Sequence, residues 1–195
     1  IIGTGSSGIQ SIPVIAAEAE HLTVFQRTPN FSVPAKNSSL DNAWVAAFKA
    51  NYAAHRHNHR IGNGSGFGDL DIEPKATVEA PTLFDEVTES EAQALLEAAW
   101  QRGGARFMTA IGDTMMNQTA NDYAQKFIHN KIRSIVHDPE TAEALCPTSH
   151  PVGTRRICVD IDYFETYNKS NVRLLNVAKD PIARVTESGV QTESE

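Results

Sequence analysis

Hydrophobic residues recur with helical spacing near the start of the chain. Between Ser7 and Glu20, isoleucines and alanines gather near one face of a helix, and this spacing predicts an amphipathic helix. Pro13 lies within its first turn and a half, where a missing N–H costs least. Residues 21–26 are rich in β-branched and aromatic side chains and predict a short strand. The two elements fit the second half of a β-α-β unit.

The middle of the chain also has a helical period. Helices are predicted at about 41–60, 88–102, 121–136 and 140–145. Thr88 and Glu91 form a capping-box signature where the second of these begins, and Gly103-Gly104 ends it. Four glycines between Ile61 and Asp71 predict a loop instead.

After Pro151 the pattern returns to strands. Short strands are predicted at 172–177, 182–186 and 190–192. A strand, a glycine turn, a helix and a second strand indicate a doubly wound α/β sheet. We therefore expect a Rossmann-like NADP-binding domain split between 1–35 and 151–195, interrupted by an α-helical insertion at 36–150.

Both ends of the chain are expected to be truncated. Only two residues precede the first glycine turn, whereas strands usually have about five or six residues. At the other end, no closing helix or strand follows the last predicted strand.

Composition and charge narrow the function classes. The formal net charge of -7 argues against a nucleic-acid binder. No apolar run approaches the roughly 18 residues that span a bilayer, and the N-terminus lacks a signal-peptide pattern. Cys146 and Cys158 form no C-x-x-C motif and indicate reduced thiols. We expect a cytoplasmic protein without nucleic-acid or membrane partners, and without a metal, because His55 and His59 lack a third ligand.

The first helix is preceded by a G-x-G-x-x-G motif, formed by Gly3, Gly5 and Gly8. In a dinucleotide site the first glycine permits a tight turn and the second leaves room for a pyrophosphate. The third lets the helix pack closely on the strand, and the phosphates face the helix N-terminus. The motif alone is weak evidence, but its position between β-branched residues and a helix strengthens it.

The end of the second strand indicates which dinucleotide is bound. NAD sites usually have Asp or Glu there to accept from the ribose 2′-OH. This chain has Gln26-Arg27-Thr28, with Arg27 19 residues after Gly8. A guanidinium grips a 2′-phosphate that a carboxylate would repel, and a threonine hydroxyl can add a hydrogen bond. NADP is therefore favoured over NAD, the alternative being a solvated surface arginine.

A second basic group follows a glycine turn, at Gly153-Thr154-Arg155-Arg156. Adjacent arginines point in different directions, so one could reach the phosphate that Arg27 binds while the other faces a different site. Composition alone would make them a solvated basic pair.

Together these motifs resemble those of the Baeyer–Villiger monooxygenases, which depend on FAD and NADPH. The resemblance runs along essentially the whole chain and is most specific where Gln26-Arg27-Thr28-Pro29 combines with Gly153-Thr154-Arg155-Arg156. The further matching segments are Gly3 to Gln10, Val24-Phe25, Val33-Pro34, Asn130 to Arg133, Asp162 to Glu165 and Asn171-Val172.

The resemblance implies a role for each matching residue. Arg27 and Thr28 would hold the 2′-phosphate of NADPH. Arg155 stands where the family usually has a lysine that contacts this phosphate, so its charge is kept but its geometry differs. Arg156 matches the catalytic arginine, which would stabilise negative charge that develops over the flavin. The residues that would line the pyrophosphate are Gly3, Thr4, Gly5, Ser6, Ser7, Gly8, Ile9 and Gln10.

The implied function is the NADPH-binding portion of an enzyme that converts ketones to esters or lactones with O₂ and NADPH. FAD would be bound mainly by a domain of the same polypeptide that is missing here, so the chain alone is expected to be inactive. One alternative is an N-hydroxylating or flavin-containing monooxygenase, which fits Gly153 to Arg156 less well. The other is a non-catalytic NADP-binding module.

Overall fold

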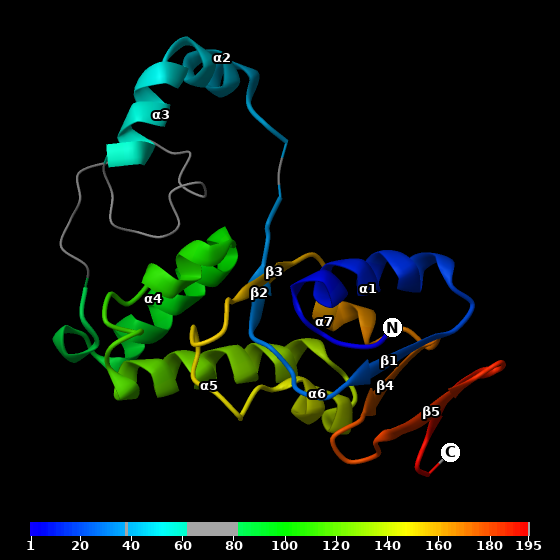
Figure 1. The fold of residues 1–195 in the computed structure, drawn as a ribbon. Coiled ribbons are helices and arrows are strands. Elements are labelled where there is room, and N and C mark those ends of the chain that lie inside the picture. The colour runs from blue at the N-terminus through cyan, green and yellow to red at the C-terminus, as the bar shows by residue number, and fades with distance from the viewer. Residues whose placement is uncertain (38, 62–81, 195) are drawn as a thin grey trace. The chain divides into compact units, whose positions relative to one another are not determined.

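A computed structural model describes residues 1–37, 39–61 and 82–194 of the chain. The chain divides into two compact units, one formed by Ile1–Ala35 with Pro81–Glu195 and the other by Lys36–Ala80. Every strand of the described residues lies in the first unit, together with several helices, so the predicted mixed α/β class is confirmed (Figure 1). The split-domain boundaries stay a prediction.

Three parallel segments form the sheet that carries the N-terminus. Strand β1 (Leu22–Gln26) pairs in parallel with β4 (Val172–Asn176). On the other edge of β1, Ile2 forms a parallel bridge with Phe25. The Gly3 N–H donates to the Phe25 carbonyl at 2.8 Å, which extends this pairing to the glycine turn. Residues 1–3 therefore run parallel to β1, but they pair with it through an isolated bridge and do not form a full strand.

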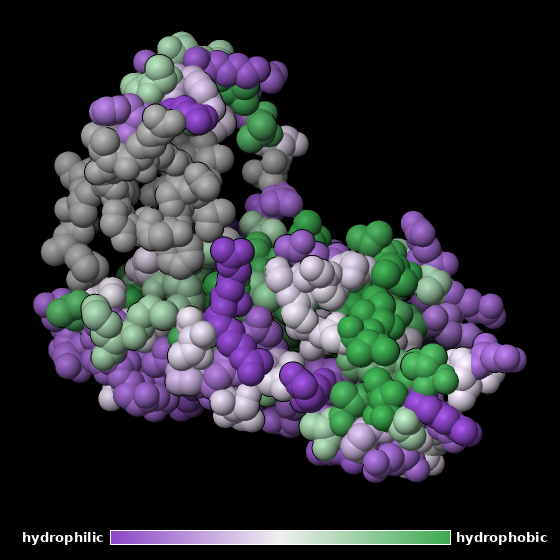
Figure 2. Space-filling model, viewed as in Figure 1, coloured by the Kyte–Doolittle hydropathy of each residue, from purple (hydrophilic) through white to green (hydrophobic). Residues whose placement is uncertain are grey.

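Helix α1 (Ser6–Glu18) connects the first and second of these segments. Its inward residues Ile9 and Ile12 are fully buried, as the apolar period predicted. Val14 and Ile15 are exposed on the same helix. An apolar area covers α1 and the neighbouring N-terminal segment on the face shown in Figure 2.

Two further pairs of short strands complete the described sheets. Strand β2 (Ser32–Pro34) pairs in parallel with β3 (Cys158–Asp160), and neither was predicted because three residues carry too little periodicity. Strands β5 (Ile182–Thr186) and β6 (Gly189–Thr192) form an antiparallel hairpin. This hairpin and β4 confirm the three strands predicted after Pro151.

The predicted helices of the middle region are present, with small shifts. In the first unit they are α4 (Glu89–Arg102), α5 (Gln118–Ile135) and α6 (Pro139–Leu145). The capping box is confirmed at the start of α4: the Glu91 carboxylate accepts the Thr88 N–H at 2.8 Å, and the Thr88 hydroxyl accepts the Glu91 N–H at 3.3 Å. Short helices that were not predicted lie at Phe84–Glu86, Ala105–Thr109 and α7 (Tyr163–Thr166).

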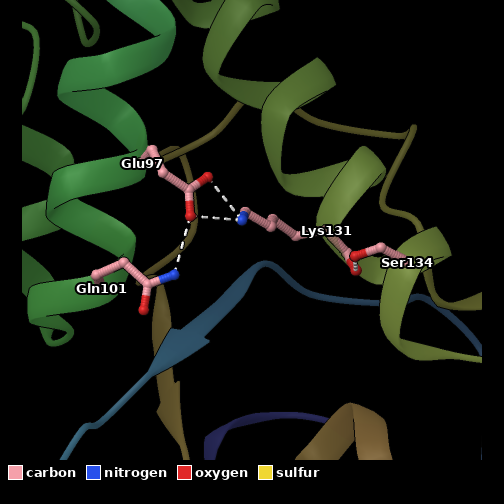
Figure 3. Close-up of polar contacts among 4 residues, drawn as sticks. All are labelled: Glu97, Gln101, Lys131 and Ser134. Carbon is pink, nitrogen blue, oxygen red and sulfur yellow. Dashed lines mark hydrogen bonds and ion pairs between the residues drawn. The ribbon is translucent and has the colours of Figure 1, made fainter.

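Helices α4 and α5 pack through an aromatic cluster and one half-buried cation, Lys131. The Trp100, Phe107 and Phe127 rings have centroids 5.8 to 6.1 Å apart. Lys131 Nζ lies 5.8 and 5.4 Å from the ring centroids of Trp100 and Phe127. It also lies 2.6 Å from Glu97 Oε2 (Figure 3). The charged group of Lys131 thus contacts both aromatic rings and the carboxylate, which links the two helices.

The second unit contributes two described helices, α2 (Asn42–Ala50) and α3 (Tyr52–Ile61). The sequence predicted one helix over 41–60, whereas α2 ends at Ala50 and Asn51 is its C-cap. Phe48 stacks with Trp44 and His55 at 5.2 and 4.7 Å between centroids. The predicted glycine-rich loop lies outside the described residues beyond Ile61.

Candidate functional site

The glycine turn has the geometry that its three glycines predicted. Gly3 has a φ of +98°, a value that L side chains rarely adopt. A Cβ on Gly8 would lie 2.4 Å from the Gly3 carbonyl oxygen, so only glycine allows this close approach of helix and strand. Around Gly5, no heavy atom lies within 4 Å of a hypothetical Cβ. The backbone at the start of α1 is therefore open to a ligand, with its first N–H groups lacking helical partners.

The predicted loop residues differ in exposure. Ser6, Ser7 and Gln10 are exposed at the start of α1. The side chains of Thr4 and Ile9 are buried instead, and the Ile9 N–H is already bonded to the Gly5 carbonyl at 2.9 Å. A ligand at the turn would thus contact backbone and exposed side chains, while Thr4 and Ile9 hold the loop from beneath.

Thr4 connects the glycine turn to the predicted phosphate-binding residues. Its hydroxyl lies 3.1 Å from Gln26 Oε1 and 3.4 Å from the Thr28 carbonyl oxygen. Gln26 is fully buried, and its Nε2 donates to the Ala144 carbonyl at 2.7 Å. Arg27, the next residue, is exposed at the end of β1. The structure therefore brings the glycine turn and the Arg27-Thr28 pair together.

Sequence reasoning did not assign a role to Gln26. Its signal was a polar residue at the end of the predicted strand, where it follows four buried or half-buried residues. A buried amide needs hydrogen-bond partners, and here they come from Thr4 and from the end of α6.

A second glycine turn precedes the two adjacent arginines. Gly153 has a φ of +89°, and a Cβ there would lie 2.2 Å from Met115 Sδ. The preceding residue is anchored to α5, because Asn121 exchanges two hydrogen bonds with the Val152 backbone at 2.9 and 3.0 Å. Arg155 and Arg156 follow with exposed side chains. Their backbone is thus anchored on both sides while their guanidinium groups are free to reach a ligand.

Strand β3 joins the arginine turn to the segment that follows Arg27-Thr28. The Cys158 N–H donates to the Phe31 carbonyl at 2.9 Å, and Asn30 Nδ2 donates to the Arg156 carbonyl at 3.2 Å. Burial raises the pKa of the buried Cys158 thiol, and hydrogen bonds from Asn30 and Ser6 oppose that rise. Ser6, Asn30 and Arg156 come from three segments that are far apart in the sequence, yet they meet around this thiol.

Asp160 fixes the β2–β3 pair from within. Its carboxylate accepts from the Ser32 hydroxyl and, at 3.1 Å, from the Tyr163 N–H. Burial raises the pKa of Asp160 to about 6 despite these hydrogen bonds. The carboxylate therefore supports the strand pair at a cost in desolvation.

His150 lies beside the arginine turn. Its ring meets Phe31 edge-on at 5.4 Å between centroids. Burial lowers the pKa of His150, and the nearby positive charge of Arg155 lowers it further. His150 is thus a neutral neighbour of the arginines at neutral pH.

The described residues lack two further kinds of site. They contain no group of three or more His, Cys, Asp or Glu placed to hold a metal ion. Each described helix is too short or too polar to cross a bilayer. Cys146 and Cys158 are both buried and free.

No protein-family model matches the chain. It is 40% identical over 196 residues to a Baeyer–Villiger monooxygenase of Pseudooceanicola batsensis, which aligns with 100% of this chain and 34% of that protein. It is also 40% identical over 198 residues to the phenazine N-monooxygenase PhzNO1 of Lysobacter antibioticus. That match covers 99% of this chain and 34% of that protein. The chain thus spans about a third of the length of the curated relatives it matches.

The fold is also found in solved structures. The crystal structure of OTEMO in complex with FAD and NADP matches with a TM-score of 0.88 and 32% sequence identity. The match covers 100% of this chain and 35% of that chain.

Proposed function

By homology along its whole length the chain belongs with the Baeyer–Villiger monooxygenases, and we propose that it forms their NADPH-binding portion. The whole enzyme would convert ketones to esters or lactones with O₂. The observation that carries the proposal is the open glycine turn at the start of α1, directly beside the exposed Arg27. The resemblance seen in the sequence motifs is confirmed by these relatives, and the activity is our proposal.

The described residues fit NADPH. The pyrophosphate would lie over Gly5 and the first turn of α1, where the backbone is open and helix N–H groups favour an anion. Arg27 would pair with the 2′-phosphate, and Thr28 would add a hydrogen bond. Residues 1–3, β1 and β4 are parallel neighbours, as in one half of a Rossmann-like sheet. This arrangement supports a doubly wound NADP-binding domain.

The two cofactors would divide the chemistry. NADPH supplies a hydride, and FAD supplies the reaction with O₂. We propose that FAD is bound mainly by another domain of the same polypeptide, because the glycine turn described above is assigned to NADPH. The chain's own contribution is to bind NADPH and to present Arg156.

The adjacent arginines would have separate roles. Arg155 is beside His150, whose pKa its positive charge lowers, and it would help Arg27 to bind the 2′-phosphate. Arg156 would place a fixed positive charge where negative charge develops on the flavin and the ketone during oxygen transfer. The anchored turn at Gly153 supports this division, since its backbone fixes the points from which the two side chains extend.

Oxygenation of a nitrogen atom is a second candidate. It is favoured by the phenazine N-monooxygenase, which is as similar to this chain as the Baeyer–Villiger relative is. Incubating the protein expressed from its complete reading frame with NADPH and either cyclic ketones or phenazines, followed by mass spectrometry, separates the two. Lactone formation supports the first function, and N-oxide formation without lactone supports the second.

The NADPH assignment is tested by Arg27→Ala in the protein expressed from its complete reading frame. Losing a charged hydrogen-bonded pair should weaken NADPH binding about 10- to 100-fold, with NADH binding unchanged. Calorimetric titration of both nucleotides measures this difference. Arg102→Ala removes an exposed arginine at the end of α4 and is the matched control. Equal losses for both nucleotides would contradict the 2′-phosphate assignment.

The role of Arg156 is tested separately. Arg156→Ala should lower the rate of oxygenation by about 10²- to 10³-fold, as loss of one charge-stabilising group does. NADPH affinity should stay near that of the parent protein. Steady-state product formation and calorimetry measure the two effects, and a joint loss would show that the roles are not separate.

A further inference from the structure

We propose that Asn30 is a positioning residue that connects the NADPH-binding segment to the backbone of Arg156. Asn30 lies two residues after Thr28 and two before β2 begins at Ser32. Its amide reaches across 126 residues of sequence to Arg156. The inference rests on the proposed function, because it takes its meaning from the roles of Arg27, Thr28 and Arg156.

The orientation of the Asn30 amide is determined by its partner. Nδ2 lies 3.2 Å from the Arg156 carbonyl oxygen and 3.2 Å from Cys158 Sγ. A backbone carbonyl can only accept, so the NH₂ group must face it. The reversed amide would place two acceptors against each other. The bond is therefore specific to an N–H donor at this position.

The other end of the same amide suggests a role beyond stability. Asn30 Oδ1 is buried and has no hydrogen-bond partner among the described residues. Buried acceptors are normally paired, and an unpaired one destabilises the fold. An amide that leaves its oxygen unpaired while donating to Arg156 is better explained by the placement of Arg156 than by stability.

Asn30 binds the backbone of Arg156 just before the chain enters strand β3. The β2–β3 ladder begins at the Ser32 and Cys158 pair. Arg156 precedes this ladder by two residues. Its carbonyl is reached by Asn30 at 3.2 Å and by the Cys158 thiol at 3.9 Å, a longer and weaker contact. Without Asn30 the Arg156 backbone would lose its nearer tether and gain freedom to shift.

The same cluster extends to the glycine turn. The side chain of Ser6 lies near enough to the Cys158 thiol to lower its pKa, and the same thiol accepts from Asn30 at 3.2 Å. The first turn of α1, the segment after Thr28 and the arginine turn are thus connected by one chain of polar contacts. This connection would keep Arg156 aligned with a nucleotide held at α1, and misplacement of a reacting group by about 1 Å can cost on the order of 10²-fold in rate.

Asn30→Asp and Asn30→Ala test the proposal in the protein expressed from its complete reading frame. Aspartate keeps the shape of asparagine but has no N–H, so it decides the case even if the alanine variant misfolds. We expect oxygenation to fall by about tenfold or more in both, with less product formed per NADPH consumed. The Kd of NADPH, measured by calorimetry, should stay within about threefold, because Arg27 and the glycine turn are unchanged. Asn37→Asp and Asn37→Ala are the matched controls, at an exposed asparagine of the other unit.

The outcomes distinguish this inference from the proposed function. Parent-like turnover and coupling in Asn30→Asp would overturn the positioning role and leave NADPH binding intact. A loss of NADPH affinity that matches the loss of turnover would also overturn it, since Asn30 would then belong to the nucleotide site or to folding. If the parent protein itself binds no NADPH, the proposed function fails, and with it the inference.

Discussion

At the scale of single residues, the site depends on positions that accept one residue type for a definable reason. Gly8 is constrained by rigid backbone, because the Gly3 carbonyl occupies the place of its Cβ. Gly153 is constrained chiefly by its positive φ, since the Met115 side chain in contact with it can move. The Gly8 constraint was predictable from the motif, whereas the contact of Gly153 with Met115 depends on folding.

Asp160 makes a residue-scale prediction about pH. Burial raises the pKa of Asp160 to about 6, so the folded state binds this proton more tightly than the unfolded state does. Its stabilising contribution is complete below about pH 4 and is lost as the pH rises through 6. The side chain of Asp160→Asn stays neutral at every pH. Between pH 4 and 7 the free energy of unfolding of this variant, relative to that of the parent protein, should therefore rise by roughly 2 kcal/mol.

Denaturant unfolding of both proteins at pH 4, 5, 6 and 7 measures this difference. Asparagine can still accept from the Tyr163 N–H, so the comparison isolates the charge. A difference that does not change with pH would show that Asp160 titrates normally in the folded protein.

At the scale of secondary-structure elements, helices with local end signals and strands of four or five residues were predicted, whereas the three-residue strands β2 and β3 were not. The start of α4 follows from Thr88 and Glu91, whose contacts span three residues. By contrast, β2 and β3 exist only because they pair with each other across the sequence. The split of the predicted 41–60 helix into α2 and α3 was also missed, because the apolar period continues through Asn51.

The α4–α5 contact makes a prediction at this scale. The hydrogen bond from Lys131 is the main cause that lowers the pKa of Glu97. The pair therefore stabilises the fold above the unfolded pKa of about 4.3 and loses this effect as the pH falls through the lower folded value. Because the Glu97 side chain is 39% exposed, solvent screening limits the coupling to about 0.5 kcal/mol.

A double-mutant cycle of Glu97→Gln and Lys131→Met measures this coupling by denaturant unfolding at pH 7 and pH 3. The coupling should be present at pH 7 and fall towards zero at pH 3. Loss of the Nζ contacts with Trp100 and Phe127 occurs in both variants that carry Lys131→Met, so it cancels and the cycle reports the ion pair. A coupling that is equal at both pH values would contradict the charge-based account.

At the scale of the whole molecule, all residues that we assign to NADPH lie in the first compact unit. They come from its two sequence segments, Ile1–Ala35 and Pro81–Glu195. The second unit contributes none of them. Nucleotide binding should therefore stabilise one unit and not the other.

Hydrogen exchange measures this difference directly. Some amides of α1 and β1 exchange only when the first unit unfolds. With NADPH at about 100 times its Kd, the free energy of opening measured at these amides should rise by about 2.7 kcal/mol. Amides of α2, in the second unit, should exchange at the same rate with and without NADPH. Equal protection of α2 would contradict the assignment of the whole nucleotide site to the first unit.

The sequence by itself determined the features whose physics is local. The glycine turn, the capping box and the apolar face of α1 each depend on residues within a few positions of one another, so their patterns are visible along the chain. The motifs also predicted the family, which the relatives confirm.

Only the tertiary structure decided which distant residues meet. Gln26 reaches Ala144, and Asn30 reaches Arg156, across more than 100 residues in each case. No periodicity encodes such pairs, because they form only when β1, β3 and α6 have packed. The sequence thus predicts which chemical groups the candidate site contains. Their alignment depends on burial and on hydrogen bonds between residues that are far apart in the sequence.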